Sequence, residues 1–134
     1  MNLEKLLTIM DTLLGENGCP WDKAQTHESL REYMLEECNE AIDAINRQNM
    51  ADLQEELGDV LLQVVFHAKL AENVGFFTMD DVIDTLANKL ISRHSHVFGS
   101  DVALNESDAL EIWKKNKEKE RIARATEISP KHEN

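Results

Sequence analysis

The chain has 134 residues, of which 42% are apolar and 30% are charged, and its formal net charge is −12. This composition fits a single soluble globular domain, and the acidic balance argues against nucleic acid as a partner, because such binding depends on lysine and arginine. No apolar run approaches the ~18 residues of a membrane span, and the N-terminal leucines are interleaved with charged residues, unlike a signal peptide. With Cys19 and Cys38 interpreted as free thiols, the sequence predicts a cytoplasmic protein with no membrane partner.

Five helices are predicted in chain order from the spacing of apolar residues. The first covers residues 2–14 and is followed by a loop over residues 16–25 that contains glycine and proline. Two long helices follow between residues 30 and 73, joined by a polar turn around residues 47–51. A fourth helix begins at the capping sequence of residues 78–81 and reaches about residue 92. Residues 93–104 are predicted to be irregular, and a last helix covers residues 106–124.

Five helices with short connections and no strand pattern predict an all-α fold, a helical bundle built on the antiparallel hairpin formed by the two long helices. We expect one domain over residues 1–124 and a frayed tail over residues 125–134. The apolar residues of the two hairpin helices, among them Ile42, Ile45 and Leu57, are predicted to form a packed seam. Long helices in so short a chain also leave an apolar face uncovered. The hairpin is therefore expected to dimerise into a four-helix core.

Acidic residues are grouped on both helices of the predicted hairpin. Helical neighbours lie three or four positions apart, so Glu36, Glu37 and Glu40 form one cluster, and Glu56 and Asp59 form another. The two clusters lie at similar numbers of residues before and after the turn. In an antiparallel hairpin they would therefore lie side by side and face each other. Such a group is either a solvated acidic surface or a site for a hard cation such as Mg²⁺ or Mn²⁺.

A glycine inside the second long helix favours the cation site over the solvated surface. Gly58 lies directly before Asp59, and a glycine within a helix costs roughly 1 kcal/mol relative to alanine. Close approach by a ligand or by a second backbone would explain its presence.

Two pairs of residues near the C-terminal end could meet a phosphate group. Lys89 and Arg93 lie four positions apart on the fourth predicted helix, and Trp113 and Lys117 have the same spacing on the fifth. Cations of this kind bind phosphate oxygens, and arginine can do so with two hydrogen bonds. The residues alone favour ordinary surface charges for Lys89 and Arg93, one of them well placed near the C-terminal end of a helix.

Taken together, these motifs resemble one family. The pattern Glu-Glu-x-x-Glu over residues 36–40, followed by Glu-x-x-Asp over residues 56–59, is similar to the acidic signature of the MazG nucleotide pyrophosphohydrolases. The stretches Asn-Gly-Cys-Pro-Trp-Asp over residues 17–22 and Arg-His-x-His over residues 93–96 resemble further motifs of this family. The similarity extends to about residue 120.

The resemblance implies Mg²⁺-dependent hydrolysis of a nucleoside triphosphate to its monophosphate and pyrophosphate, with Mn²⁺ as a possible substitute. It assigns the metal ligands to Glu37, Glu40, Glu56 and Asp59. It assigns catalytic roles to Glu36, Glu37, Lys89 and Arg93, with Glu36 as a further ligand or as the group that orients or deprotonates the attacking water. It assigns substrate binding to Lys89, Arg93, Trp113 and Lys117.

An alternative is a non-catalytic helical dimer that binds nucleotides or a regulatory partner. Many members of the family carry two such domains in tandem, whereas this chain resembles only the first. Ser95 also stands where the family motif usually has proline, which would loosen the loop after Arg93. In either case we expect a homodimer or a dimer of dimers.

Overall fold

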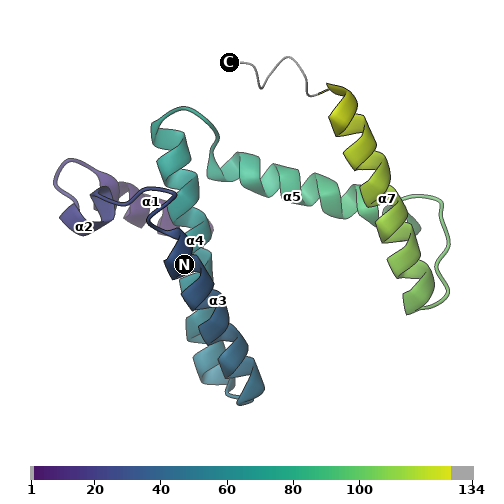
Figure 1. Cartoon of the computed structure of the whole chain (residues 1–134), viewed down its shortest axis with the longest axis horizontal. Coiled ribbons are helices and arrows are strands. Elements are labelled where there is room, and N and C mark those ends of the chain that lie inside the picture. The colour runs from purple at the N-terminus through teal and green to yellow at the C-terminus, as the bar shows by residue number, and fades with distance from the viewer. Residues whose placement is uncertain (1, 128–134) are drawn as a thin grey trace. The chain divides into compact units, whose positions relative to one another are not determined.

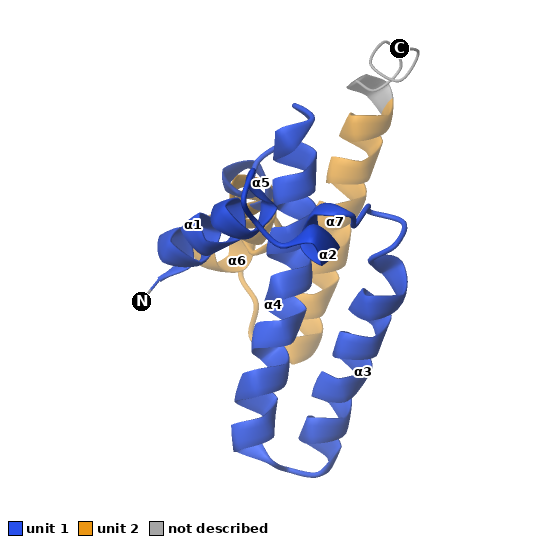
Figure 2. Cartoon of the chain, turned by 90° about the vertical axis from the view of Figure 1, so that its left-hand side faces the viewer, with its two compact units in different colours: residues 1–82 blue, residues 83–134 orange. Residues whose placement is uncertain are grey.

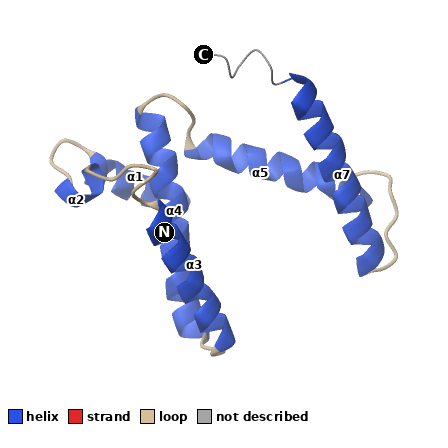
Figure 3. Ribbon diagram, in the orientation of Figure 1, coloured by secondary structure: helices blue, strands red, loops and turns tan. Residues whose placement is uncertain are grey.

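The computed structural model describes the backbone of residues 2–127 and the side chains as far as residue 125, and it is helical with no strand within that range (Figure 1, Figure 3). The seven described helices are α1 (Leu3–Leu14), α2 (Pro20–Lys23), α3 (Arg31–Asn46), α4 (Met50–Asn73), α5 (Met79–Arg93), α6 (Ser95–Phe98) and α7 (Glu106–Glu127). The predicted all-α fold is confirmed.

The five long helices correspond to the five that the sequence predicts, and two short helices lie in segments predicted to be irregular. Pro20 occupies the first turn of α2, where its missing N–H is not needed. Helix α6 lies in the predicted irregular stretch after Arg93. Helix α7 continues to Glu127, and residues 128–134 of the predicted tail lie outside the described residues.

The chain forms two compact units, residues 1–82 and residues 83–134 (Figure 2). Helices α1 to α4 belong to the first unit, and α6 and α7 belong to the second. Helix α5 begins in the first unit and continues into the second.

The first unit is built on the hairpin of α3 and α4, which lie side by side (Figure 2). Gln48 adopts the left-handed conformation at the turn, with φ of 56°. Arg47 closes the turn because it bonds Asp43 at 2.9 Å and Asp52 at 3.0 Å. The side chain of Asn49 caps α4 by accepting a hydrogen bond from the N–H of Asp52. The hairpin predicted from residues 47–51 therefore forms where expected.

The core of this unit lies where α1 packs against α4. Its buried members are Met10, Leu30, Val65, Phe66, Ala68 and Met79. Burial of each of the larger side chains, such as those of Met10, Leu30 and Phe66, contributes about 1.5–3 kcal/mol to the stability of the fold. A buried cation reinforces the same contact, because Lys69 bonds Asp11 of α1 at 2.7 Å and Glu72 at 3.0 Å. Burial lowers the pKa of Lys69, but these two carboxylates outweigh that effect and raise it.

Much of the apolar surface of the hairpin is not covered within the chain. Ile42 and Ile45 of α3 and Leu57 of α4 are each a little over half exposed. The apolar spacing predicts all three inside a packed seam, and within one chain this is wrong for each of them. The buried positions of α3 are Ala41 and Ala44. The smaller alanines let the helices of the hairpin pack closely, and the larger isoleucines are left outside.

The second unit is held together by polar contacts as well as by packing of α6 on α7. The side chain of Glu120 accepts hydrogen bonds from Arg93 and from Ser92. Ser95 donates to Asp101 at 2.6 Å and accepts from Asn116 at 2.8 Å. The hydroxyl of Ser95 thus ties the start of α6 to two other segments.

Among the described residues, no helix combines the length and the apolar character that a membrane crossing requires.

Candidate functional site

Four carboxylates from the two helices of the hairpin converge on one point. Oxygen atoms of Glu37 and Glu40 on α3 and of Glu56 and Asp59 on α4 all lie within 4.8 Å of one another. Glu40 is exposed, and the other three are partly buried. The hairpin turn sets this register, since it places the two acidic clusters at the same level of the antiparallel pair. Their separation matches what one or more small cations would bridge.

The charges of this four-carboxylate group are not balanced by the chain itself. No ion pair within the described residues includes any of the four, and Oε2 of Glu37 and Oε2 of Glu56 are buried without a hydrogen-bond partner. Burial raises the pKa of Glu56 to about 7, and the adjacent carboxylates, Glu40 first, add to the rise. Burial and the same neighbours raise the pKa of Glu37. The group thus lacks a positive charge.

Two further residues of the hairpin flank this group. Glu36 is exposed on α3 and lies outside the four-carboxylate group, although its charge contributes to the raised pKa of Glu37. Among the described residues, and apart from its chain neighbours and the adjacent backbone of its own helix, no atom lies within 4 Å of the position where a Cβ of residue 58 would stand. A second backbone of the same chain therefore does not explain the glycine. The space beside the helix at this position is open to a ligand or to another copy of the chain.

In the second unit, two of the predicted cations lie near the same aromatic ring. The guanidinium carbon of Arg93 is 5.3 Å from the centre of the Trp113 ring, and the Lys117 ammonium is 5.0 Å from it. Both distances are within the range of a cation–π interaction. The predicted residues Arg93, Trp113 and Lys117 are therefore brought together.

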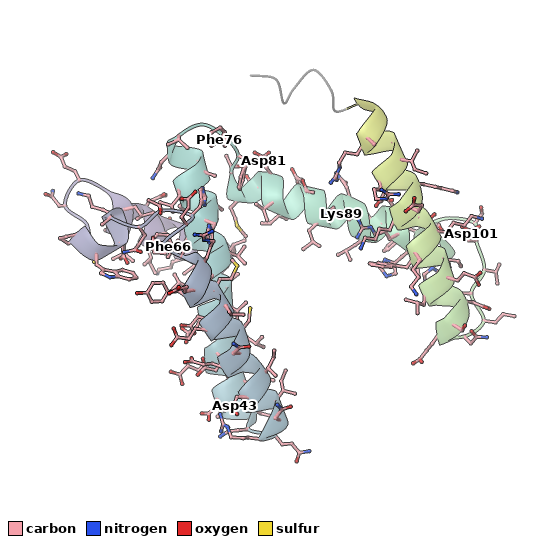
Figure 4. The ribbon with its side chains drawn as sticks, viewed as in Figure 1. Asp43, Phe66, Phe76, Asp81, Lys89 and Asp101 are labelled. Carbon is pink, nitrogen blue, oxygen red and sulfur yellow. The ribbon has the colours of Figure 1, made fainter. Side chains whose placement is uncertain are left out.

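Glu120 also contacts Arg93, and the sequence analysis did not identify this residue. Its Oε2 lies 2.8 Å from Nε of Arg93, and bonds to Ser92 and Arg93 lower the pKa of its carboxyl, with a further contribution from the charge of Lys89. Lys89 is partly buried on α5 (Figure 4). Because Glu120 is 27 residues from Arg93, no local spacing predicts the contact.

The all-helical fold and the four converging carboxylates define an α-helical protein with an acidic site of the kind that holds a divalent cation. The sequence profile described as the MazG nucleotide pyrophosphohydrolase domain matches residues 25–98. This match covers more than half of the chain, so the chain belongs to the MazG nucleotide pyrophosphohydrolase family.

Individual relatives agree with this assignment. The chain is 50% identical over 127 residues to the nucleoside triphosphate pyrophosphohydrolase/pyrophosphatase MazG of Thermotoga maritima, covering 95% of this chain and 50% of that protein. It is 46% identical over 124 residues to the nucleoside triphosphate pyrophosphohydrolase of Escherichia coli K12, covering 92% of this chain and 47% of that protein. The chain thus spans about half the length of these curated relatives.

The fold has also been observed in a solved structure. The crystal structure of a MazG-related protein from Thermotoga maritima superimposes with a TM-score of 0.71 at 28% sequence identity, over 87% of this chain and 99% of that one. The all-helical fold is therefore shared with that MazG-related protein.

Proposed function

We propose that the protein hydrolyses nucleoside and deoxynucleoside triphosphates to the monophosphate and pyrophosphate with Mg²⁺ as cofactor, in the manner of an enzyme that cleans the nucleotide pool. The observation that carries this proposal is the four-carboxylate group, whose ligand atoms lie within 4.8 Å of one another without a cation of the chain. The names of the relatives support the reaction type. In the reaction, water adds to phosphorus and the bond to the pyrophosphate group breaks.

The residues of the group fit Mg²⁺, with Mn²⁺ as a substitute. The donor atoms are all carboxylate oxygens, which hard cations prefer, and two of them are buried without a partner. Glu37, Glu40, Glu56 and Asp59 are the proposed ligands. When bound, the metal neutralises charge on the phosphate oxygens and lowers the pKa of bound water.

The remaining site residues act on the water and on the substrate. We assign to Glu36, exposed beside Glu37, the role of orienting the attacking water or accepting its proton. Lys89 and Arg93 bind phosphate oxygens, because each offers a permanent positive charge and several N–H donors. Trp113 and Lys117 contact the nucleotide beside Arg93. Glu120 occupies only one edge of the Arg93 guanidinium, so other donors of that group stay available for phosphate.

Residues 1–124 are proposed to act as one functional domain in a homodimer or a dimer of dimers in the cytoplasm. The half-exposed apolar side chains of the hairpin, Ile42, Ile45 and Leu57, support dimerisation because a second copy would bury them. Pairing of two hairpins would produce a four-helix core.

A non-catalytic helical dimer that binds nucleotides or a regulatory partner is the second candidate. The observation that favours it is that the chain spans about half of its curated relatives. In that case the carboxylates would bind a metal–nucleotide complex without hydrolysing it.

Product analysis separates the two candidates. The purified chain is incubated with each of the eight common ribonucleoside and deoxynucleoside triphosphates and Mg²⁺, and the products are resolved chromatographically. Monophosphate with an equal amount of pyrophosphate, lost on addition of EDTA, is the result that we expect. Diphosphate with orthophosphate would contradict the proposed reaction. Absence of turnover from folded protein with either Mg²⁺ or Mn²⁺ would favour the binding protein.

A further inference from the structure

Two histidines that are 40 residues apart in the sequence meet in the first unit, where Nδ1 of His27 lies 2.7 Å from Nδ1 of His67. His27 belongs to the turn before α3, and His67 belongs to α4. The two ring planes are 6° apart, and the ring centres are 5.0 Å apart. That distance equals the separation of the nitrogens plus about one ring radius on each side, so the line of centres runs through both nitrogens. The rings therefore lie head to head in nearly one plane.

A contact with this geometry is a hydrogen bond with one proton between the two nitrogens. A neutral imidazole has one nitrogen that donates and one that accepts, so one Nδ1 donates to the other. When the pair takes up one proton, one Nδ1–H still points at the lone pair of the other ring. When both rings are protonated, two N–H groups and two positive charges face each other, and the bond is lost. The pair thus tolerates one added proton and not two.

The two rings differ in their access to water. His27 is exposed, whereas His67 is partly buried, and Nε2 of His67 is buried without a hydrogen-bond partner. Burial lowers the pKa of His67 from its ordinary value of 6.5, and the charge of His27 lowers it further. The second proton, which breaks the contact, therefore binds only in acid.

The chain does not pair either histidine with an acidic group. No ion pair within the described part of the chain includes one of them. The charged residues on the adjoining elements include Asp11 of α1, Asp22 and Lys23 of α2, Glu28 before α3, Arg31 and Glu32 at its start, and Lys69 and Glu72 of α4. Asp11 and Glu72 bond Lys69, and the side chains of Lys23 and Arg31 donate to backbone oxygens. The repulsion within a doubly protonated pair is therefore not relieved by an ion pair.

The histidine contact holds the turn that leads into α3. Within this turn, the N–H of Thr26 donates to the hydroxyl of Ser29 at 2.8 Å, and the N–H of Ser29 donates to the hydroxyl of Thr26 at 3.0 Å. Leu30, at the end of the turn, is buried in the core with 1% of its surface exposed. The turn is thus attached by Leu30 to the core and by His27 to α4. Loss of the histidine contact removes one of these two attachments.

We propose that His27 and His67 form a proton-sensitive latch, which holds the start of α3 against α4 at neutral pH and releases it in acid. Helix α3 carries Glu37 and Glu40, so His67 is also a positioning residue for half of the four-carboxylate group. This consequence rests on the proposed function, whereas the latch itself does not.

The titration of the two rings tests the latch directly. The ring signals of His27 and His67 are followed by NMR in the metal-free chain from about pH 8 to about pH 4.5. We expect the pair to take up its two protons in steps separated by more than about one pH unit. Uptake of both protons in a single step near the ordinary value of histidine would overturn the proposal. This measurement uses the unchanged protein and does not depend on whether a variant folds.

Release of the turn is measured by hydrogen exchange at the amides of Ser29 and Leu30, which donate to the hydroxyl and to the carbonyl of Thr26. After correction for the intrinsic effect of pH on exchange, we expect protection to fall about tenfold from pH 7 to pH 5, the value of one hydrogen bond. Protection of these amides that stays constant over this range would contradict the latch.

The variant His27→Asn separates the latch from other groups that titrate in this range. Its side-chain amide stands where Nδ1 of histidine stands, so it can donate to neutral His67 or, after a flip, accept from protonated His67. The turn should then stay protected at both pH values. His94→Asn, which removes a histidine of the second unit, is the matched control and should keep the tenfold loss. A tenfold loss that persists in folded His27→Asn would overturn the latch.

Turnover distinguishes the latch from its consequence for the site. The loss of kcat/KM between about pH 7 and about pH 5.5 is expected to be several-fold smaller in His27→Asn than in the unchanged protein. Equal losses in the two proteins would overturn the positioning role of His67. Acid release of the turn in a protein that hydrolyses no nucleotide would support the latch and count against the proposed reaction.

Discussion

Nε of Arg93 lies 2.8 Å from Oε2 of Glu120, and both side chains are largely shielded from solvent. The same glutamate accepts from Ser92, so the side chain of Arg93 is held from one edge while its other nitrogen atoms stay free to donate. A fixed guanidinium binds phosphate with a smaller loss of conformational entropy than a mobile one. We therefore interpret Glu120 as a positioning residue for Arg93.

Replacing this glutamate tests the interpretation. Glu120→Gln is expected to raise KM for nucleoside triphosphates several-fold with a smaller change in kcat, because the charge that orients Arg93 is weakened. The free energy of unfolding should fall by about 1 kcal/mol. Glu118→Gln is the control, since Glu118 pairs with Arg121 on the same helix in an exposed position. Equal KM values for the two variants would contradict the positioning role.

Stability should depend on pH through Glu56. Its pKa is raised to about 7 by burial and by Glu40 beside it, so the folded state binds a proton that the unfolded state releases near the ordinary value of 4.5. The contribution of this group to stability is therefore complete below about pH 4.5 and is lost as the pH rises towards 7. Thermal melts of metal-free protein across this range, compared with Glu56→Gln, measure the effect.

Metal binding should show the opposite trend with pH. Since a ligating carboxylate must be deprotonated, the affinity for Mg²⁺ is expected to rise between pH 5 and pH 8, with release of protons at the lower values. Calorimetric titration in buffers of different ionisation enthalpy counts these protons. Proton uptake on binding, or an affinity independent of pH, would show that Glu56 is not a ligand.

The variant Gly58→Ala tests whether a ligand or a second chain comes close to this position of α4, as distinct from an effect on helix stability alone. The structure leaves room for the methyl group, so helix propensity should raise the stability of the isolated chain by roughly 1 kcal/mol. If a substrate or another copy comes close to this position, turnover or dimerisation will fall at the same time. Melting temperature, sedimentation and kinetics of one preparation give all three values. If the variant is more stable and its turnover and assembly are unchanged, neither a ligand nor a second chain comes close to Gly58.

The contact of α1 with α4 should carry a large part of the stability of the first unit. Met10 is buried in that contact, with 1% of its surface exposed, so Met10→Ala is expected to cost about 2–5 kcal/mol. Ile9→Ala, at a half-exposed position of the same helix, should cost much less. Chemical denaturation of both variants provides the comparison.

Local patterns were sufficient to predict the helices and the register of the hairpin. The apolar spacing identifies α1 and α4 to within a few residues of the observed bounds, and a tight turn then determines which residues of α3 and α4 are level. This is why Glu37 and Asp59 were expected to face each other from sequence alone.

Contacts between segments that are distant in the sequence do not follow from such local patterns. Glu120 is joined to Arg93 across 27 residues, and the burial of Gln63 depends on the meeting of four helices. Helical periodicity also placed Ile42 in a packed seam, although the chain itself covers only part of that face. Tertiary packing and assembly decide such positions, and neither follows from the spacing of residues along one helix.

The most direct measurement of the central claim is Mg²⁺-dependent turnover by Asp59→Asn, compared with Glu55→Gln, which removes the same charge from an exposed position of α4 outside the four-carboxylate group. Both variants are first checked for native helix content. The account predicts that Asp59→Asn loses at least a hundredfold in kcat/KM and binds Mg²⁺ weakly, while Glu55→Gln keeps nearly full activity. Monophosphate and pyrophosphate produced by Asp59→Asn at the rate of the unchanged protein would contradict it.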